Sequence, residues 1–253
     1  MSLTNKVVIV TGASSGIGAA TAVLFAKEGA DVAIVARNQS KLEAVAKQIQ
    51  EYGKTPLIIK ADLSKEDEVS SVVSQTVNHF GQLNILINNA GIAVEGSILN
   101  GKVLQAYDEV MKTNVRAVLQ LAMLAAPHLI KTKGNVVNVS SAAAFTTCRT
   151  PTLISYYVSK AALDHFTRCA ALELASSGVR VNSVNPGPVD NAFLDHSGFG
   201  AVDKYKQGLI DGTALGYMAT DEEIAGVILF LASDKAKSVT GSNYLIDNGY
   251  LLK

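Results

Sequence analysis

A tyrosine and a lysine stand four positions apart in the second half of the chain, at Tyr156 and Lys160. On a helix this spacing places both side chains on one face, about one turn apart. A lysine ammonium so close favours the ionised form of the tyrosine hydroxyl, which otherwise has a pKa of about 10 and is a poor acid or base at neutral pH. The pair therefore predicts proton transfer by Tyr156, although a solvated contact on a helix surface has the same spacing.

A short apolar strand, a glycine-rich turn and a helix begin the chain. The run at 6–11 has no polar alternation, which is typical of a parallel strand covered on both faces. The turn that follows is Gly12-Ala13-Ser14-Ser15-Gly16-Ile17-Gly18, and we expect a helix from Ala19 to Lys27. Glycines let the backbone approach a pyrophosphate, and the helix N-terminus offers free N–H groups to that anion. The segment predicts nucleotide binding.

The glycine spacing, Gly-x-x-x-Gly-x-Gly after Thr11, resembles that of the short-chain dehydrogenase/reductase family. Further motifs follow in the order found in that family: Asn88-Asn89-Ala90-Gly91, Asn114, Ser140-Ser141, the pair Tyr156 and Lys160, Asn185-Pro186-Gly187, and Asp247-Asn248-Gly249, where Asn248 replaces a glycine. The motifs extend over nearly all of the 253 residues. The resemblance implies an α/β fold, a single Rossmann-like doubly wound parallel sheet with helices on both faces.

The resemblance also implies roles for individual residues. The catalytic set would be Asn114, Ser141, Tyr156 and Lys160, in which Asn114 orders a water that connects Lys160 to solvent, and Ser141 binds the substrate oxygen. The cofactor site would comprise Gly12, Ser14, Ser15, Gly16, Ile17, Gly18, Arg37, Asp62, Leu63, Asn89, Ala90, Gly91, Tyr156, Lys160, Pro186, Gly187, Val189 and Asn191. Preorganised donors aimed at developing charge commonly lower a barrier by about 3 kcal/mol.

Two of these assignments depart from the family pattern. Ser141 precedes Tyr156 by 15 positions, more than is usual, so we expect an extra bend at 146–151. Ser140 is farther still and Ser155 adjoins the tyrosine, which leaves Ser141 as the choice. Asn191 stands where the family often has a threonine that binds the nicotinamide carboxamide.

The residue after the second strand indicates which cofactor is bound. An NAD site wants an Asp or Glu about eighteen residues beyond the last glycine, where it binds the ribose diol. The chain has Ala36-Arg37-Asn38 instead. No carboxylate would repel a 2′-phosphate there, and Arg37 can meet it with a planar fork of donors. We therefore expect NADP(H) rather than NAD(H), while Arg37 as a plain surface cation remains the alternative.

Composition excludes several other classes of protein. Lys and Arg together number 22, as do Asp and Glu, and we find no basic run that would track a nucleic acid. No apolar stretch reaches the ~20 residues that span a bilayer. The two cysteines, Cys148 and Cys169, have no metal-ligand spacing. Because Met1 leads almost at once into a strand, we expect no signal peptide and a cytoplasmic location.

Strand-like and helix-like segments alternate along the chain, which predicts one doubly wound domain over 1–253. Expected strands lie at 6–11, 31–36, 55–61, 85–87, 135–139 and 180–185, and expected helices at 19–27, 40–52, 65–80, 102–129 and 155–176. The segment 245–249 resembles the last strand of the family and the turn that ends it. The interval 188–218 has scattered aromatics and no steady period. Because it follows a strand at its carboxyl end, where ligands bind in such sheets, we expect a substrate-binding flap there.

Together these features predict reversible hydride transfer between NADPH and a carbonyl, with the protein supplying position and a proton. Ala142 to Phe145, with Leu194 and Phe199, suggest a largely apolar pocket for a steroid, a lipid or a small ketone. A reductase of 3-oxoacyl thioesters and a sensor that binds NADP(H) without catalysis are the alternatives. By resemblance we expect a homotetramer, or else a dimer, that uses the apolar face of 117–126.

Overall fold

The computed structural model describes residues 3–148, 152–191, 193 and 202–253. Within them, seven parallel strands form one sheet in the order β3-β2-β1-β4-β5-β6-β7. The strands are β1 (Val7–Thr11), β2 (Asp31–Ala36), β3 (Leu57–Lys60), β4 (Ile85–Asn88), β5 (Asn135–Val139), β6 (Arg180–Pro186) and β7 (Asn243–Ile246). The doubly wound parallel sheet expected from the sequence is confirmed, and it forms a single domain.

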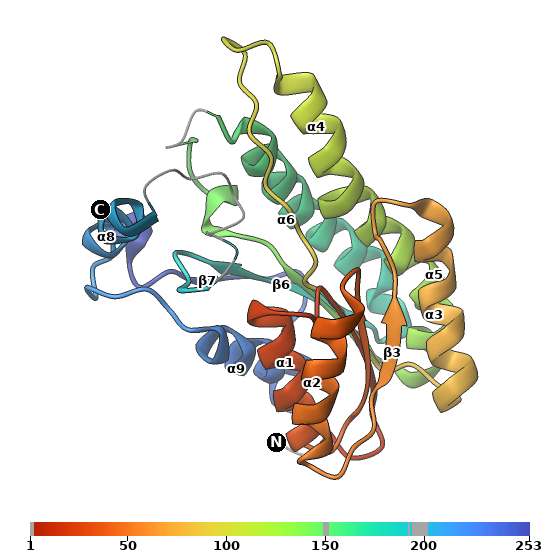
Figure 1. Cartoon of the computed structure of the whole chain (residues 1–253). Coiled ribbons are helices and arrows are strands. Elements are labelled where there is room, and N and C mark those ends of the chain that lie inside the picture. Colours follow the sequence, from red (N-terminus) through yellow and green to blue (C-terminus); the bar gives the residue numbers. More distant parts are fainter. Residues whose placement is uncertain (1–2, 149–151, 192, 194–201) are drawn as a thin grey trace.

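Helices cover both faces of this sheet (Figure 1). They are α1 (Gly16–Lys27), α2 (Gln39–Gln50), α3 (Glu66–Phe80), α4 (Val103–Met111), α5 (Ala117–Thr132), α6 (Ile154–Leu174), α8 (Val202–Gly212) and α9 (Asp221–Ala232). Helices α1, α2 and α9 lie on one face, and α3, α5, α4 and α6 lie on the other. The strand order reverses between β1 and β4, so the sheet has its switch point where those two strands end.

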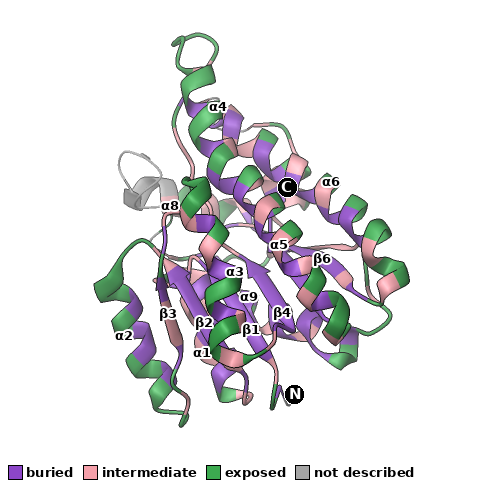
Figure 2. Ribbon diagram, turned by 90° about the vertical axis from the view of Figure 1, so that its right-hand side faces the viewer, coloured by how far each residue is buried: buried purple, intermediate pink, exposed green. Residues whose placement is uncertain are grey.

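The central strands β1, β2 and β4 are buried on both faces, which explains why their sequences are almost entirely apolar (Figure 2). In β1, Val8 and Val10 pack into the cluster beneath α1 and α9, whereas Val7 and Ile9 pack into the cluster beneath α3 and α5. Successive side chains of a strand point to opposite faces, so one strand contributes to both halves of the core. This burial holds the strand ends rigidly at one edge of the sheet.

Helix α1 begins at Gly16, three residues earlier than expected from the sequence. The first turn of a helix needs no partner for its N–H groups, and the Ser15 carbonyl already accepts from Ala19 at 3.3 Å. Gly16, Ile17 and Gly18 are therefore part of the helix. Their free N–H groups lie at the carboxyl edge of β1.

The single long helix expected at 102–129 is divided in the structure. A π-helical turn, Lys112–Arg116, lies between α4 and α5. Such turns insert one extra residue and occur often at functional sites. The other expected elements are confirmed, with ends that differ by a few residues.

The expected flap at 188–218 lies partly outside the described residues. Its described parts include a bridge between Val189 and Ala219 and the helix α8. Leu194 and Phe199, which were expected in the pocket, fall in the segment that is not described. Of the helices that the structure describes, none is long and apolar enough to cross a membrane.

Candidate active site

A cleft of about 630 Å³ opens at the carboxyl ends of the strands. The described residues that line it include almost all of the expected cofactor site: Gly12, Ser14, Ser15, Gly16, Ile17, Arg37, Asp62, Leu63, Asn89, Ala90, Gly91, Tyr156, Lys160, Pro186, Gly187, Val189 and Asn191. Gly18 is buried behind the loop and does not line the cleft. The structure thus brings together residues that are more than 170 positions apart in the sequence.

Asn89 and Thr11 hold the glycine loop against the neighbouring strand. The Asn89 side-chain amide donates to the carbonyls of Thr11 at 2.9 Å and Gly12 at 3.3 Å. The Thr11 hydroxyl accepts from the backbone N–H groups of Asn89 at 3.0 Å and Ala90 at 3.1 Å. A Cβ on Gly12 would approach the Asn89 amide to 2.7 Å, and the backbone there has φ +66, which favours glycine. These contacts fix the loop before any ligand arrives.

The far end of the cleft carries positive charge. Arg37 and Asn38 follow β2, and Lys41 lies in the first turn of α2, where the Asn38 side chain accepts from the Lys41 N–H at 3.1 Å. Lys41 was not expected from the sequence. It could have been predicted, because Asn38 is a typical helix cap and Lys41 lies in the first turn of the helix that follows Arg37.

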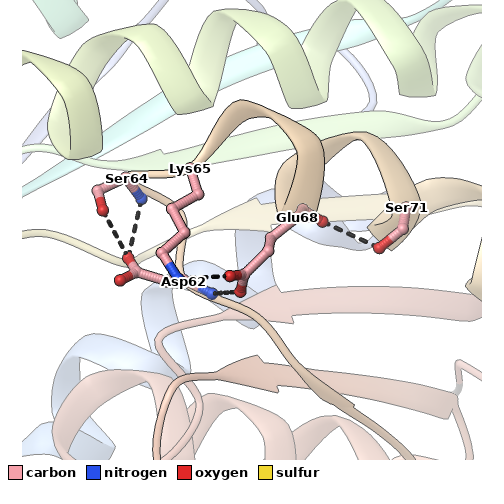
Figure 3. A network of polar contacts seen from close by, with 5 residues as sticks. All are labelled: Asp62, Ser64, Lys65, Glu68 and Ser71. Atoms are coloured by element: carbon pink, nitrogen blue, oxygen red, sulfur yellow. Dashed lines mark hydrogen bonds and ion pairs between the residues drawn. The ribbon is translucent and has the colours of Figure 1, made fainter.

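Asp62 lies beside this cationic end and is held by its neighbours (Figure 3). Its carboxylate accepts from the Ser64 N–H at 3.0 Å and hydroxyl at 2.8 Å, and its own N–H donates to Glu68 at 2.7 Å. Burial acts to raise the pKa of Asp62. The Ser64 hydrogen bonds and the charges of Arg37 and Lys65 outweigh it, so the pKa lies below its ordinary value. Asp62 is therefore a fixed anion and acceptor in the cleft.

Tyr156, Ser141 and Lys160 lie together in the middle of the cleft. The Ser141 side chain lies within reach of the Tyr156 hydroxyl, where a hydrogen bond between them acts to lower the pKa of Tyr156, and its own hydroxyl also lies 3.5 Å from the Pro186 carbonyl. The Lys160 ammonium lies 5.6 Å from the centre of the Tyr156 ring and donates to the Val139 carbonyl at 2.8 Å. The two α6 residues share one helix face, as their spacing predicted.

Burial determines the acidity of both groups on α6. It raises the pKa of Tyr156 above its ordinary value, and the hydrogen bond with Ser141 opposes this only in part. It also lowers the pKa of Lys160 to about 8, and the charge of Asp164 opposes that change. The sequence predicted a lowered tyrosine pKa. The protein groups alone give the opposite direction, because desolvation of the phenolate outweighs the other influences.

Ser141 rather than Ser140 faces the tyrosine. The Ser140 hydroxyl is buried and donates to the Lys160 carbonyl at 3.2 Å, while Ser155 donates to Val103 at 3.4 Å. Ser141 precedes a short 3-10 turn, Ala142–Ala144, and its hydroxyl accepts from the Ala143 N–H at 3.1 Å. The extra bend expected at 146–151 lies partly outside the described residues.

Asn114 lies in the π-helical turn and is 1% exposed. Its side chain accepts from the Ile92 N–H at 2.8 Å and donates to the Ile92 carbonyl at 2.9 Å and to the Ser159 hydroxyl at 3.0 Å. The asparagine thus ties the segment after β4 to the helix that carries the tyrosine. A Cβ on Gly91 would lie 3.5 Å from both Asn114 Oδ1 and Lys160 Nζ, so the absence of that atom keeps this part of the cleft open.

The turn after β6 closes the other side of the cleft. Gly187 packs tightly on Asp247. A Cβ added to Gly187 would lie only 2.6 Å from the Cβ of Asp247, so only glycine fits there without a shift. Asn191 lines the cleft, but its amide donates to Asp221 at 2.7 Å and its oxygen accepts from the Phe193 N–H at 3.0 Å. Binding of a carboxamide by Asn191 stays a prediction, because its side chain already has two partners here.

The apolar wall differs in part from the expected one. Ala142 and Ala143 line the cleft, whereas Phe145 is half exposed and does not. Residues not expected in the wall are Ile92, Ala93, Thr113, Thr146, Leu153, Tyr157, Pro188, Leu209 and Tyr250. The Phe193 ring lies 5.9 Å from that of Tyr156, centre to centre. Leu209 lies in the interval 188–218 that was expected to cover the substrate, whereas Tyr250 comes from the end of the chain and no sequence pattern links it to the site.

The cleft combines a glycine loop at a helix N-terminus with a serine, a tyrosine and a buried lysine at the ends of the strands. This combination defines a nucleotide-binding oxidoreductase. Comparisons with known proteins agree. A family model described as Enoyl-(Acyl carrier protein) reductase matches residues 12–251. The chain is 38% identical over 250 residues to L-xylulose reductase of Caenorhabditis elegans, and the match covers 98% of this chain and 96% of that protein.

Two further relatives are similar over nearly their whole length. The chain is 35% identical over 246 residues to 3-oxoacyl-(acyl-carrier-protein) reductase FabG of Staphylococcus aureus, with 96% and 97% covered. L-Sorbose reductase of Gluconobacter frateurii, solved with NADPH and L-sorbose, is 30% identical, has a TM-score of 0.92 and matches 100% of this chain and 99% of that one. The chain belongs to the short-chain dehydrogenase/reductase family, and it is an oxidoreductase that acts on carbonyl or CH–OH groups.

Proposed function

We propose that this protein reversibly reduces a ketone to a secondary alcohol with NADPH. The observation that carries the proposal is the cluster in the cleft, where Ser141, Tyr156 and Lys160 line one wall and the Lys160 ammonium lies 5.6 Å from the centre of the Tyr156 ring. A protonated hydroxyl beside a second donor is the arrangement that a developing alkoxide oxygen requires.

The residues of the cleft fit a nicotinamide dinucleotide. The first turn of α1 presents N–H groups to a pyrophosphate, Asp62 is held as an acceptor, and the glycine at position 91 leaves space above Lys160. When bound, the nicotinamide supplies or accepts the hydride. Gly12 to Gly18 would hold the pyrophosphate, and Lys160 would bind the ribose next to the nicotinamide.

The protein residues handle the proton and the charge. In reduction, Tyr156 Oη donates its proton to the substrate oxygen, and the Ser141 hydroxyl hydrogen-bonds that same oxygen as negative charge grows on it. In oxidation, Tyr156 takes the proton back. Lys160 stabilises the tyrosinate by its charge, and Asn114 would order a water between Lys160 and solvent. Apolar walls such as Leu153 and Phe193 exclude other water from the reacting atoms.

Arg37 supports NADP(H) as the cofactor. It follows β2 at the position where an NAD site would have a carboxylate, and Lys41 adds a second cation to the same end of the cleft. A guanidinium binds a phosphate with two parallel hydrogen bonds, which a hydroxyl of NAD cannot match. The sorbose reductase that superposes on this chain was solved with NADPH.

The cleft favours a largely apolar ketone or alcohol, such as a steroid, another lipid or a small carbonyl compound. Its described wall near Tyr156 consists mostly of Ala, Ile, Leu, Pro and Phe side chains, with the hydroxyl groups of Thr146, Tyr157 and Tyr250 at intervals. The similarity to FabG favours a second candidate, reduction of a 3-oxoacyl thioester. An acyl carrier would need basic residues at the mouth of the cleft, but the interval 188–218 has few, and Lys206 among them is paired with Asp190 at 2.9 Å, which weakens that candidate.

The test of the function is a substrate panel. Oxidation of NADPH is followed by absorbance with apolar ketones of graded size, a ketose and a 3-oxoacyl thioester, each measured again with NADH. We expect turnover of apolar ketones with NADPH in preference to NADH. Faster turnover of the thioester would establish the second candidate. Binding of NADPH without turnover of any compound would contradict both.

We also propose that the protein is a homotetramer. Helix α5 buries Leu121 and Ala125 beneath it but exposes Leu119 and Met123, the latter at 67%. Exposed apolar residues at this spacing form a stripe along the outer side of the helix, where association with another copy would bury them. Light scattering would give a mass of about four chains of 26.5 kDa.

A further inference from the structure

Asp164 is a buried carboxylate that the proposed chemistry does not use. It lies on α6 and is 4% exposed. Burial of an unpaired charge is costly, so such a group needs a partner. Its Oδ2 accepts from the Asn185 amide at 2.7 Å, and its Oδ1 lies 3.3 Å from the Ser183 hydroxyl, whose single proton is shared with the nearer Asn185 oxygen at 2.9 Å. These partners are neutral, and the carboxylate therefore still lacks a counter-charge among them.

Lys160 is the cation whose charge acts on this carboxylate, from one turn earlier on the same helix and without a direct ion pair between the two groups. The ammonium is 4% exposed and donates to Val139, and the spacing of four residues places the two side chains on one helix face. Burial lowers the pKa of Lys160 to about 8, and Asp164 is the charged group of the described chain that opposes this. On other elements, the Val139 carbonyl that accepts from the ammonium and the Asn114 side chain, which faces the same Gly91, carry no charge. Tyr156, on its own helix, is neutral below its raised pKa.

Asn185 connects the same carboxylate to the backbone of Ser141. It lies on β6 and is fully buried. Its amide nitrogen donates to Asp164 and also to the Ser141 carbonyl at 3.1 Å, and its oxygen accepts from the Ser183 hydroxyl at 2.9 Å. One side chain thus spans from the helix of the lysine to the end of the strand that carries the serine.

We propose that Asp164 is a positioning residue of the active site, the buried counter-ion of Lys160 and, through Asn185, the anchor of the Ser141 backbone. The proposal rests on the proposed function for the roles of Lys160 and Ser141. It implies that Asp164 keeps the lysine charged at neutral pH, where the charge is needed to bind the ribose and stabilise the tyrosinate.

Asp164→Asn removes the charge and can keep the hydrogen bonds. The new oxygen can accept from Asn185, and the new nitrogen can donate to the Ser183 hydroxyl, whose own proton already points to Asn185 at 2.9 Å. The titration of Lys160 is measured by NMR with ¹³Cε-labelled lysine, and the signal is assigned by its loss in Lys160→Met. We expect the pKa of Lys160 to fall by about one unit when the opposite charge is removed.

The pH profile of kcat/KM gives the second readout. If charged Lys160 is the active form, activity falls as the pH rises through the pKa of the lysine. A lower pKa in Asp164→Asn therefore moves the alkaline fall of the profile to lower pH by the same amount. Thr167→Val serves as the control, because Thr167 is fully buried on the same helix but bonds to Asn138 and Leu163 instead. It should leave the titration and the profile in place.

Either of two results would overturn the proposal: an unchanged Lys160 titration in Asp164→Asn, or a shifted titration with an unchanged pH profile. If Asp164→Asn does not fold, the same two measurements on Asp164→Ser, which also lacks the charge, decide the question. If the wild-type protein turns over no compound of the substrate panel, the proposed function is refuted instead. The Lys160 titration would still decide whether Asp164 is the counter-ion.

Discussion

Tyr156 illustrates how one side chain combines a local pattern with its surroundings. Its spacing from Lys160 predicted a shared helix face, and the structure places the ammonium 5.6 Å from its ring. Its acidity depends on burial, which raises the pKa, and on Ser141, which is distant in sequence. At neutral pH the hydroxyl therefore keeps its proton. A protonated tyrosine is the form that reduction of a carbonyl requires, so we expect reduction to be the faster direction near pH 7.

Arg37 permits a prediction about the cofactor at the scale of one residue. In Arg37→Ala the 2′-phosphate of NADPH loses its planar donor, and a charge-assisted hydrogen bond contributes about 1.5–3 kcal/mol. We expect the ratio of kcat/KM for NADPH to that for NADH to fall by about tenfold or more. Lys47→Ala, at an exposed position near the end of α2, the helix that follows Arg37, is the matched control. An unchanged ratio in Arg37→Ala would refute the phosphate assignment.

Among the elements, the strands were the most predictable. The run of β2 is apolar after Asp31 and has no polar alternation, and both β2 and β5 have the bounds that the sequence predicted. The division between α4 and α5 was not predictable, because the π-helical turn at Lys112–Arg116 depends on the contacts of Asn114 with Ile92 and Ser159. The same holds for Tyr250, which only the tertiary fold brings to the cleft.

Two glycines in helices allow a prediction about the glycine loop. In Gly18→Ala the new Cβ would clash with the Gly12 carbonyl and the Asn89 amide, both of them fixed groups of the loop. We expect the free energy of unfolding to fall by about 1–3 kcal/mol and NADPH to bind more weakly. Gly226→Ala in α9 meets nothing within 4 Å. It should raise stability by about 0.5–1 kcal/mol, since alanine favours a helix.

Urea unfolding with dinucleotide titration by fluorescence measures both variants of this pair. Equal effects on stability and on NADPH affinity in Gly18→Ala and Gly226→Ala would show that the close approach of Gly18 to Gly12 has no part in holding the loop.

For the whole molecule, the sheet brings a buried lysine and a buried carboxylate into one core, and this gives the stability a pH dependence. The pKa of Lys160 is about 8 when folded and 10.5 as its reference value. Between these values the unfolded chain binds more protons than the folded one, so the contribution of Lys160 to the free energy of unfolding rises with pH. The slope approaches about 1.4 kcal/mol per pH unit.

Urea denaturation at several pH values from 8 to 10, at one protein concentration, tests this slope. We expect Lys160→Met to lack the rise that the wild type shows, and Lys47→Met to retain it, because Lys47 is exposed. Parallel curves for the wild type and Lys160→Met would mean that the lysine is not buried as described. The tetramer and the cytoplasmic location remain predictions at this scale.

The central claim is that the Tyr156 hydroxyl transfers the proton that accompanies the hydride. The most direct measurement is the turnover number of Tyr156→Phe with NADPH and the best ketone of the panel, beside NADPH affinity measured by fluorescence. General acid catalysis contributes about 10²- to 10⁴-fold, so we expect a loss of that size with NADPH affinity nearly unchanged. Tyr107→Phe, which alters an exposed tyrosine of α4, should keep the wild-type rate. A near-normal rate in Tyr156→Phe would contradict the account.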